Sequence, residues 1–382
     1  MAVAAHALQA TDLLRDFGRG DARAREESWR YSKPALRALS QQDFIAADTQ
    51  AVLPDDLRAR FEWPQTRGRR VVFVNGAFSE AHSDIAQLGA AFTVGESAGN
   101  TWSIRIDGEV DEPVHVVYAN VPAMQASRWH ANVAVTLVSG RSGVIEQHLG
   151  AGGNPVLGSV HRQFELAAGT QLDFVSLCEL PDSAALYRHV DARVGTQATL
   201  RTTQVLLGGR LQRLDMQVDL AGAQARLQSR GVFALRGREQ VDTQLDVRHV
   251  ARDTASDVLW RGVADQRARG IFHGAITVAQ GADGADAQLS NKNLLLSALA
   301  EIDTQPVLEI YADEVKAAHG ATVGQIDQTA LFYLRARGIP EAEAKRLLVG
   351  AFCAAALDRV AQPWLREHFT NLLAPRLAEA HA

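Results

Sequence analysis

His319 is the side chain in this sequence best placed to bind a metal. It lies in the stretch AAHGATVGQ, beside Gly320, where the strand-like part of the chain closes and a polar turn is expected. A neutral imidazole can ligate iron, and it needs an exposed, uncrowded position to do so. Gly320 would let another backbone approach closely. A histidine that only satisfies hydrogen bonds within a turn fits the same residues, so both interpretations stay open.

The cysteines, Cys178 and Cys353, limit what metal chemistry the chain can perform alone. A self-contained iron–sulfur site takes about four thiolate ligands, more than this chain holds. Cys178 alternates with Phe174 and Ser176 on one face of an expected strand, which predicts a buried structural thiol. Cys353 falls in an apolar helical pattern and is predicted to pack rather than to bind metal.

Enzyme motifs are missing or stand in the wrong context. No GxxxxGK[ST] sequence occurs, so no ATP site is expected on this chain. GESAG at 95–99 matches the GxSxG pattern of a nucleophile elbow, but a strand-like segment follows where a helix is required, so Ser97 is predicted to be a loop residue. GAGGNP at 150–155 is predicted to be a loop as well. The 12 histidines form no HExxH motif, and His249 and His273 are predicted to be structural residues in strands.

Three regions position these residues. Residues 1–66 are predicted to be an N-terminal helical region, with an apolar stripe between residues 7 and 17. Residues 67–326 are predicted to be the β core, because short alternating runs closed by Gly, Asp or Asn recur along them. No helical pattern separates the later strands, which argues against a doubly wound α/β fold. A sandwich, a barrel or a stacked β-solenoid remains, and the even strand spacing favours the solenoid.

Residues 327–382 are predicted to be a C-terminal helical region. Asp327 or Thr329 can cap a first helix that Gly338 ends, and Pro340 opens a second. The second helix, over 340–358, carries apolar residues on two opposite faces. One stripe includes Leu347 and Phe352, and the other holds Val349, Cys353, Ala356 and Leu357. A helix that is apolar on both sides is either fully buried or shares one face with a partner.

Composition narrows the class of protein further. The net charge is −5 over 382 residues, which argues against a broad nucleic-acid surface. No run of about 18 apolar residues is present, so no membrane span is expected. The N-terminal sequence lacks the pattern of a signal peptide, and a cytoplasmic location is the expectation.

Several stretches together resemble the SufB/SufD family of iron–sulfur cluster assembly proteins, and the SufD side fits best. EESWRYS at 26–32 is similar to an N-terminal family motif, His249 with Thr254 and Ser256 to a His…Thr-x-Ser element, and Trp260-Arg261-Gly262 to a Trp-Arg/Lys-Gly element. QLSNKNLLLS, IDTQPVLEIYADEVKAAHGATVGQ and ALFYLRARGI resemble the C-terminal signature of the family.

The resemblance implies a mainly β protein with a right-handed parallel β-helix (β-solenoid) core and α-helical regions at both ends. It implies a non-enzymatic scaffold that pairs with a SufB-like subunit across the end of the β-helix. The same resemblance implies a SufC-like ABC ATPase bound by the C-terminal helices, and a transient iron–sulfur cluster shared with SufB. A reduced flavin has been associated with such complexes, but no motif places it on this chain.

By position, the resemblance assigns the nascent-cluster role to His319 and the dimer interface to His319, Gly320 and Val323. Many relatives carry a cysteine at the position of Ala317, which this chain lacks. The ATPase contact is expected at the second helix of the C-terminal region, through Leu347, Val349, Phe352, Cys353 and Leu357.

Two other classes of function stay open at this stage. A β-helix carbohydrate-active enzyme, a lyase or an esterase, would display carboxylates along one sheet face and is usually secreted. A homodimeric binding module would use the same strand edge to pair with a second copy of the chain.

Overall fold

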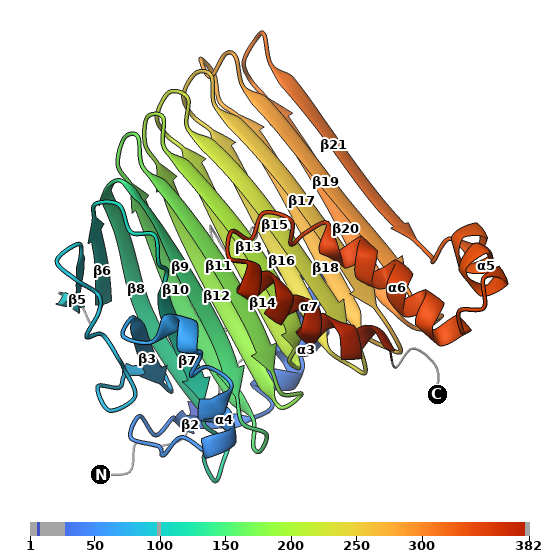
Figure 1. Cartoon of the computed structure of the whole chain (residues 1–382), viewed down its shortest axis with the longest axis horizontal. Helices are drawn as coiled ribbons and strands as arrows, with labels where there is room; N and C mark the ends of the chain where they lie inside the picture. The colour runs from blue at the N-terminus through green and yellow to red at the C-terminus, as the bar shows by residue number, and fades with distance from the viewer. Residues whose placement is uncertain (1–5, 8–26, 98–100, 379–382) are drawn as a thin grey trace.

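Parallel strands stacked side by side build the body of the protein (Figure 1). The computed structural model describes residues 6–7, 27–97 and 101–378. Within these residues the strands form an 11-stranded and a 10-stranded sheet, and the chain alternates between the two sheets in about eight solenoid turns. Strands on successive turns pair in parallel, so the predicted solenoid is confirmed and the sandwich and the barrel are excluded.

The described elements follow one another in a regular order. The first sheet holds β1 (His6–Ala7), β2 (Asp43–Ala46), β5 (Phe92–Ser97), β6 (Thr101–Asp107), β8 (Ser127–Ser139), β10 (Val156–Leu166), β12 (Ala184–Val194), β14 (Leu211–Leu220), β16 (Gln240–His249), β18 (Arg269–Val278) and β20 (Glu301–Ile310). The second sheet holds β3 (Arg70–Val74), β4 (Ala77–Phe78), β7 (Val114–Asn120), β9 (Arg141–Gly150), β11 (Gln171–Leu180), β13 (Thr199–Gly208), β15 (Arg226–Leu235), β17 (Ala255–Ala264), β19 (Asp286–Leu295) and β21 (Lys316–Gly324).

The core lies between the two sheets and follows from period-two alternation. In β14 the side chains of Leu214, Met216 and Val218 are buried in one large apolar cluster that both sheets share. Each strand repeats this pattern at the same register as its neighbour, so the inward side chains stack from turn to turn. A buried apolar stack of this kind is the main source of stability in a solenoid.

The Trp260-Arg261-Gly262 element shows why its residue types are needed. Trp260 points into the core, and a Cβ added to Gly231 on the neighbouring strand would come within 2.3 Å of its ring. A Cβ on Gly262 would come within 2.2 Å of Phe233, so both glycines leave space for aromatic rings. Arg261 points outward instead and lies over the ring of Phe352, 5.6 Å from its centre.

The N-terminal segment is divided between the outer faces of the two sheets, because residues 29–44 pack on the first sheet and residues 53–61 pack on the second. It contains η1 (Arg30–Ser32), α3 (Lys33–Ser40), α4 (Asp55–Ala59) and η2 (Pro64–Thr66), with β2 among them. Trp29 is buried, and the guanidinium of Arg213 lies 4.2 Å from its ring centre and donates to the carbonyl of Ser28 at 2.8 Å. The EESWRYS motif thus anchors this segment. Most of the apolar stripe expected between residues 7 and 17 lies outside the described residues.

The C-terminal helices are α5 (Gln328–Ala336), α6 (Glu341–Ala354) and α7 (Pro363–Ala378). The helices α6 and α7 pack on the outer face of the second sheet, whereas α5 lies beyond the last strands (Figure 1). The side chain of Asp327 accepts hydrogen bonds from the backbone of Thr329 and Ala330, and Gly338 adopts a φ of 87° just after α5, so both predicted helix signals are confirmed. The domain limits at 66 and 326 stay predictions.

A buried ion pair interrupts the apolar core near the first turns. Arg162 contacts Glu146 and donates to the Tyr118 hydroxyl at 2.7 Å, while His148 Nε2 lies 2.7 Å from the same carboxylate. Burial alone would raise the pKa of Glu146, but Arg162 and His148 hold it at about 2. The carboxylate is therefore ionised inside the solenoid and depends on its partners.

Replacing Arg162 by Ala should therefore destabilise the fold by about 3–5 kcal/mol, because it leaves a buried carboxylate without its cation. Chemical denaturation of the purified chain would measure the loss. The double variant Arg162→Met with Glu146→Gln should recover much of it. If the double variant is no more stable than Arg162→Ala, the pairing does not explain the cost.

Candidate functional site

The last turn of the solenoid leaves an open end. In the described part of the chain, β20 ends the first sheet and β21 ends the second, and each pairs on one side only. An edge strand of this kind presents unpaired backbone N–H and C=O groups to a further strand. We call the exposed side chains and edges of β20 and β21 the terminal rim.

His319 lies within β21, so the prediction that it stands in a polar turn is wrong. Pairing with β19 extends the strand region over the histidine and sets it directly beside Leu289. Leu289 is buried in the core, whereas His319 is exposed, because no further turn covers it. The imidazole thus occupies the position of the next core layer. Gly320 has open space on its Cα, which fits the uncrowded surroundings expected there.

Apolar side chains accompany the histidine on the terminal rim. Val323 is 42% exposed, Ile310 43% and Tyr311 62%. Val323 stands beside Asn293, which is buried, so it too continues an inward row that nothing covers. Large apolar groups left exposed next to free strand edges are typical of an interaction surface.

A row of hydrogen-bonded polar side chains lies beneath the rim and explains why two asparagines of the QLSNKNLLLS stretch are buried. Asn291 and Asn293 are both buried, and Asn293 donates to Asn291 at 2.6 Å. Thr304 of β20 donates to Asn291 at 2.8 Å, and Asn293 donates to the carbonyl of Thr322 in β21 at 3.0 Å. These hydrogen bonds join the last strands of both sheets and fix the shape of the open end. Period-two alternation alone does not single out these two amides.

The residues predicted as ATPase contacts divide between two faces of α6 and the turn that follows it. Val349, Cys353 and Leu357 are buried against the outer face of the second sheet, beside Val232 and Val263. Both faces of the helix are apolar, so hydrophobicity could not decide which one packs inward.

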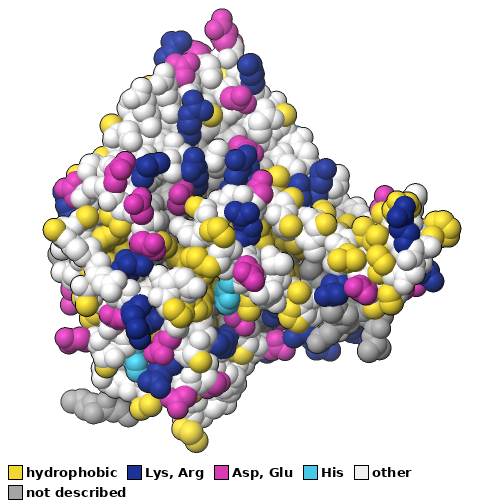
Figure 2. Space-filling model, viewed as in Figure 1, with side chains coloured by type: hydrophobic (Ala, Val, Ile, Leu, Met, Phe, Trp, Pro, Cys, Tyr) yellow, Lys and Arg dark blue, Asp and Glu magenta, His cyan; other side chains and the backbone are white. Residues whose placement is uncertain are grey.

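Leu347 and Phe352, which are also predicted ATPase contacts, lie on the other side of α6. Leu347 is 47% exposed, and Phe352 is half-buried beneath Arg261. Leu347, Gly350, Ala351 and Ala354 line one side of an apolar groove of about 300 Å³ between α6 and α7. In Figure 2 hydrophobic side chains gather over α5 and the adjoining end of α6, where Phe332 and Tyr333 are also exposed.

Neither cysteine is available as a ligand in this conformation. Cys178 and Cys353 are both fully buried, and burial raises the pKa of each thiol to about 12. The metal ligand is the thiolate, which is rare at neutral pH when the pKa is this high. The buried structural role predicted for Cys178 is confirmed.

The other family-like residues serve the fold. His249 is buried, with Nδ1 2.8 Å from the Thr254 hydroxyl and Nε2 2.9 Å from that of Ser256. Burial lowers the pKa of His249 to about 4, so the ring is neutral at pH 7. The first three residues of GESAG lie in β5, which pairs antiparallel with β6, and Ser97 ends that strand instead of standing in a loop. That geometry differs from the strand-to-helix turn of a nucleophile elbow.

Comparison with known proteins agrees with this geometry. The family model described as "SUF system FeS cluster assembly, SufBD core domain" matches residues 123–352, which include the solenoid turns from β8 onward and most of α6. The chain belongs to the SufB/SufD family. The resemblance stated from the sequence is thereby confirmed, and the relatives show that the chain is SufD-like.

The relatives differ in how much of each chain they share. The iron–sulfur cluster assembly protein SufD of Escherichia coli is 34% identical over 212 residues, which cover 56% of this chain and 50% of that protein. A SufBD family protein of Synechocystis is 26% identical over 381 residues, covering 88% and 83%. SufD of Bacillus subtilis is 31% identical over 138 residues, covering 36% and 32%. The chain thus matches half the length of the Escherichia coli relative.

No helix in the described residues is long and apolar enough to cross a membrane.

The two faces of α6 make opposite predictions for stability. Leu357→Ala should cost about 2–5 kcal/mol, because it opens a cavity against the sheet. Leu347→Ala should change the free energy of unfolding by less than about 0.5 kcal/mol, because the side chain is exposed. Denaturation of both variants measures the difference. A larger loss for Leu347→Ala than for Leu357→Ala would mean that α6 packs with the other face inward.

Proposed function

We propose that the chain is a non-enzymatic scaffold subunit of a Suf-type assembly system, in which the terminal rim pairs with a SufB-like subunit. The observation that carries this proposal is the open end of the solenoid, where inward rows of side chains continue onto an uncovered surface. A second solenoid stacked there would bury Val323 and Ile310 and would satisfy the free strand edges by strand addition. Membership of the iron–sulfur cluster assembly family supports the choice of partner.

His319 is the residue through which this chain would take part in cluster formation. Its exposed imidazole stands at the proposed interface, and a neutral imidazole is a ligand for iron. Both thiols of this chain are buried and protonated, so the partner subunit would supply the thiolates of a nascent cluster. The cluster is cargo shared between two subunits in this proposal and leaves when assembly ends.

The surface formed by α5, α6 and the α6–α7 groove would bind a SufC-like ATPase. Leu347, Phe332 and Tyr333 are exposed there, next to a groove lined by small apolar side chains. The chain has no phosphate-binding motif of its own, so ATP hydrolysis would belong to the partner. Val349, Cys353 and Leu357 would support this surface from beneath, and Leu347 would make direct contact. A reduced flavin stays an expectation from the resemblance, with no residue of this chain assigned to it.

Two alternative functions, a homodimeric binding module and a β-helix enzyme, make different use of the terminal rim and the sheet faces. A homodimeric module would pair two terminal rims, so the partner of the rim would be a second copy. A β-helix enzyme would need free carboxylates on a sheet face, but the guanidinium of Arg213 already binds Asp215 at 2.6 Å and Asp242 at 2.7 Å on the outer face of the first sheet. Such pairing suits docking of the N-terminal segment better than acid–base chemistry. We place this scaffold in the cytoplasm, as its family resemblance implies.

His319→Ala should reduce cluster assembly by about tenfold or more in the reconstituted complex without changing the melting temperature of the chain, because the side chain is exposed. Cluster formation would be followed by visible absorption and iron content. His130→Ala removes another exposed histidine, far along the solenoid, and serves as the control. A parallel loss of melting temperature and assembly would assign His319 a structural role only.

Val323→Glu should abolish pairing with the SufB-like subunit, because it buries a charge at the proposed interface. Thr322→Glu lies on the opposite phase of the same strand and should weaken pairing far less. Co-purification and light scattering measure the complexes. If both variants pair normally with the partner, the terminal rim is not the interface. A self-paired wild-type chain that ignores the SufB-like subunit would favour the homodimer.

Leu347→Glu should prevent co-purification of the SufC-like ATPase while the solenoid stays folded, because a charge would enter an apolar contact surface. Ala342→Glu introduces the same charge at an exposed position of α6 outside the groove and should leave ATPase binding intact. Circular dichroism confirms that each variant is folded. Retention of the ATPase by Leu347→Glu would move the contact elsewhere.

A further inference from the structure

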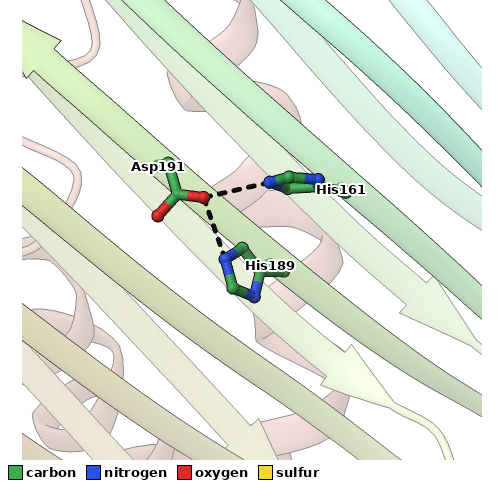
Figure 3. A group of neighbouring side chains, drawn as sticks. All are labelled: His161, His189 and Asp191. Carbon is green, nitrogen blue, oxygen red and sulfur yellow. Dashed lines mark hydrogen bonds and ion pairs between the residues drawn. The ribbon is translucent and has the colours of Figure 1, made fainter. Parts of the chain in front are cut away.

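Two histidines and an aspartate from neighbouring turns meet on the outer face of the first sheet (Figure 3). His161 comes from β10, and His189 and Asp191 come from β12. The parallel register sets His161 directly beside His189, and Asp191 follows two residues later on the same face. Their ligand atoms all lie within 4.8 Å of one another. The side chains are between 22% and 41% exposed, so ions in solution can reach them.

The spacing of the three groups fits a single metal ion. Asp191 Oδ2 lies 3.0 Å from His161 Nε2 and 2.9 Å from His189 Nε2. Bonds from a divalent metal to an imidazole nitrogen or a carboxylate oxygen are about 2.0–2.2 Å long. Two ligand atoms that bind the metal at an angle of about 90° to each other are therefore about 3.0 Å apart. Two histidines and one carboxylate are the ligand set of open iron(II) sites, and they also suit zinc and cobalt.

A chain of hydrogen bonds sets the tautomer of His189. The carboxylate of Asp215 is held by Arg213 and can only accept, so the Tyr187 hydroxyl, at 3.1 Å, donates to it. The Tyr187 oxygen is then the acceptor for His189 Nδ1, at 3.2 Å, and that nitrogen carries the proton. In a neutral ring the other nitrogen, Nε2, is then the one that can bind a metal ion. This arrangement orients a metal-binding imidazole from behind.

One carboxylate oxygen, Asp191 Oδ2, is shared by the Nε2 atoms of both histidines. The two imidazole rings stand close together, with their centres 4.7 Å apart. The three ligand atoms therefore converge on one small region at the surface of the sheet. A single divalent ion bound there could accept all three ligands at once.

We propose that His161, His189 and Asp191 form a binding site for one divalent first-row transition-metal ion, of the class of iron(II). The site lies on β10 and β12, whereas the terminal rim begins four strands further along the sheet at β20. With about 4.8 Å between strands, roughly 20 Å separates the two. The metal site therefore stands apart from the proposed subunit interface and does not depend on the proposed scaffold function.

The test uses the full chain, free of any affinity tag and stripped of metal with a chelator. Cobalt(II) is titrated anaerobically and followed by its visible absorption, zinc(II) is titrated by calorimetry, and iron(II) is added as a competitor of bound cobalt. We expect one ion per chain. His161→Ala and Asp191→Asn should each weaken metal binding at least about tenfold. Tyr187→Phe should weaken it about tenfold, because it removes the hydrogen bond that fixes the tautomer of His189.

His273→Ala is the matched control, because His273 lies in the same outward row three strands further along the sheet. It removes one imidazole, as His161→Ala does, and should leave cobalt binding unchanged. Binding that is equal in wild type, His161→Ala and Asp191→Asn would overturn the proposal, as would the absence of a one-to-one site. No partner protein enters this assay, so its outcome is separate from that of the scaffold experiments.

Discussion

Parallel main-chain pairing between successive turns is the interaction on which this structure depends. Each strand is held by its neighbours on both sides, so a solenoid satisfies every turn except those at its ends. At the early end the antiparallel strands β4 and β5 pair with β3 and β6 and close the stack. At the late end β20 and β21 keep one unpaired edge each among the described residues. The open edges at the late end are the reason that the proposed pairing is placed there.

In-register stacking also explains why side chains far apart in the sequence act together. Residues at equivalent positions of successive turns form rows, both inside and outside the sheets. Inside, such a row places His319 in line with Leu289 at the point where the core runs out. Outside, it places His161 beside His189. The exposure of His319 at the terminal rim and the meeting of His161 with His189 are thus two consequences of one register.

The helical segments at both ends of the chain convert the solenoid faces into distinct surfaces. The N-terminal segment covers part of the first sheet through Trp29 and Arg213. The helices α6 and α7 cover the second sheet, and Arg376 of α7 forms an ion pair of 2.8 Å with Glu239. Three surfaces stay open among the described residues: the terminal rim, the groove between α6 and α7, and the part of the first sheet that carries His161, His189 and Asp191. Each of the proposed contacts uses one of these three surfaces.

Local patterns were enough to predict the strands and the caps of α5, because alternation, Asp327 and Gly338 act within a few residues of their effects. The choice of a solenoid over a sandwich or a barrel also needed the family resemblance. The strand that contains His319 and the inward face of α6 could not be predicted in this way. Both depend on which surface the segment meets, and Val349 and Leu347 are equally apolar. The meeting of His161 with Asp191 required the in-register pairing of β10 with β12, which sets each residue beside the one 28 positions later in the chain. Only the stacked turns decide such distances, because main-chain hydrogen bonds between strands fix them.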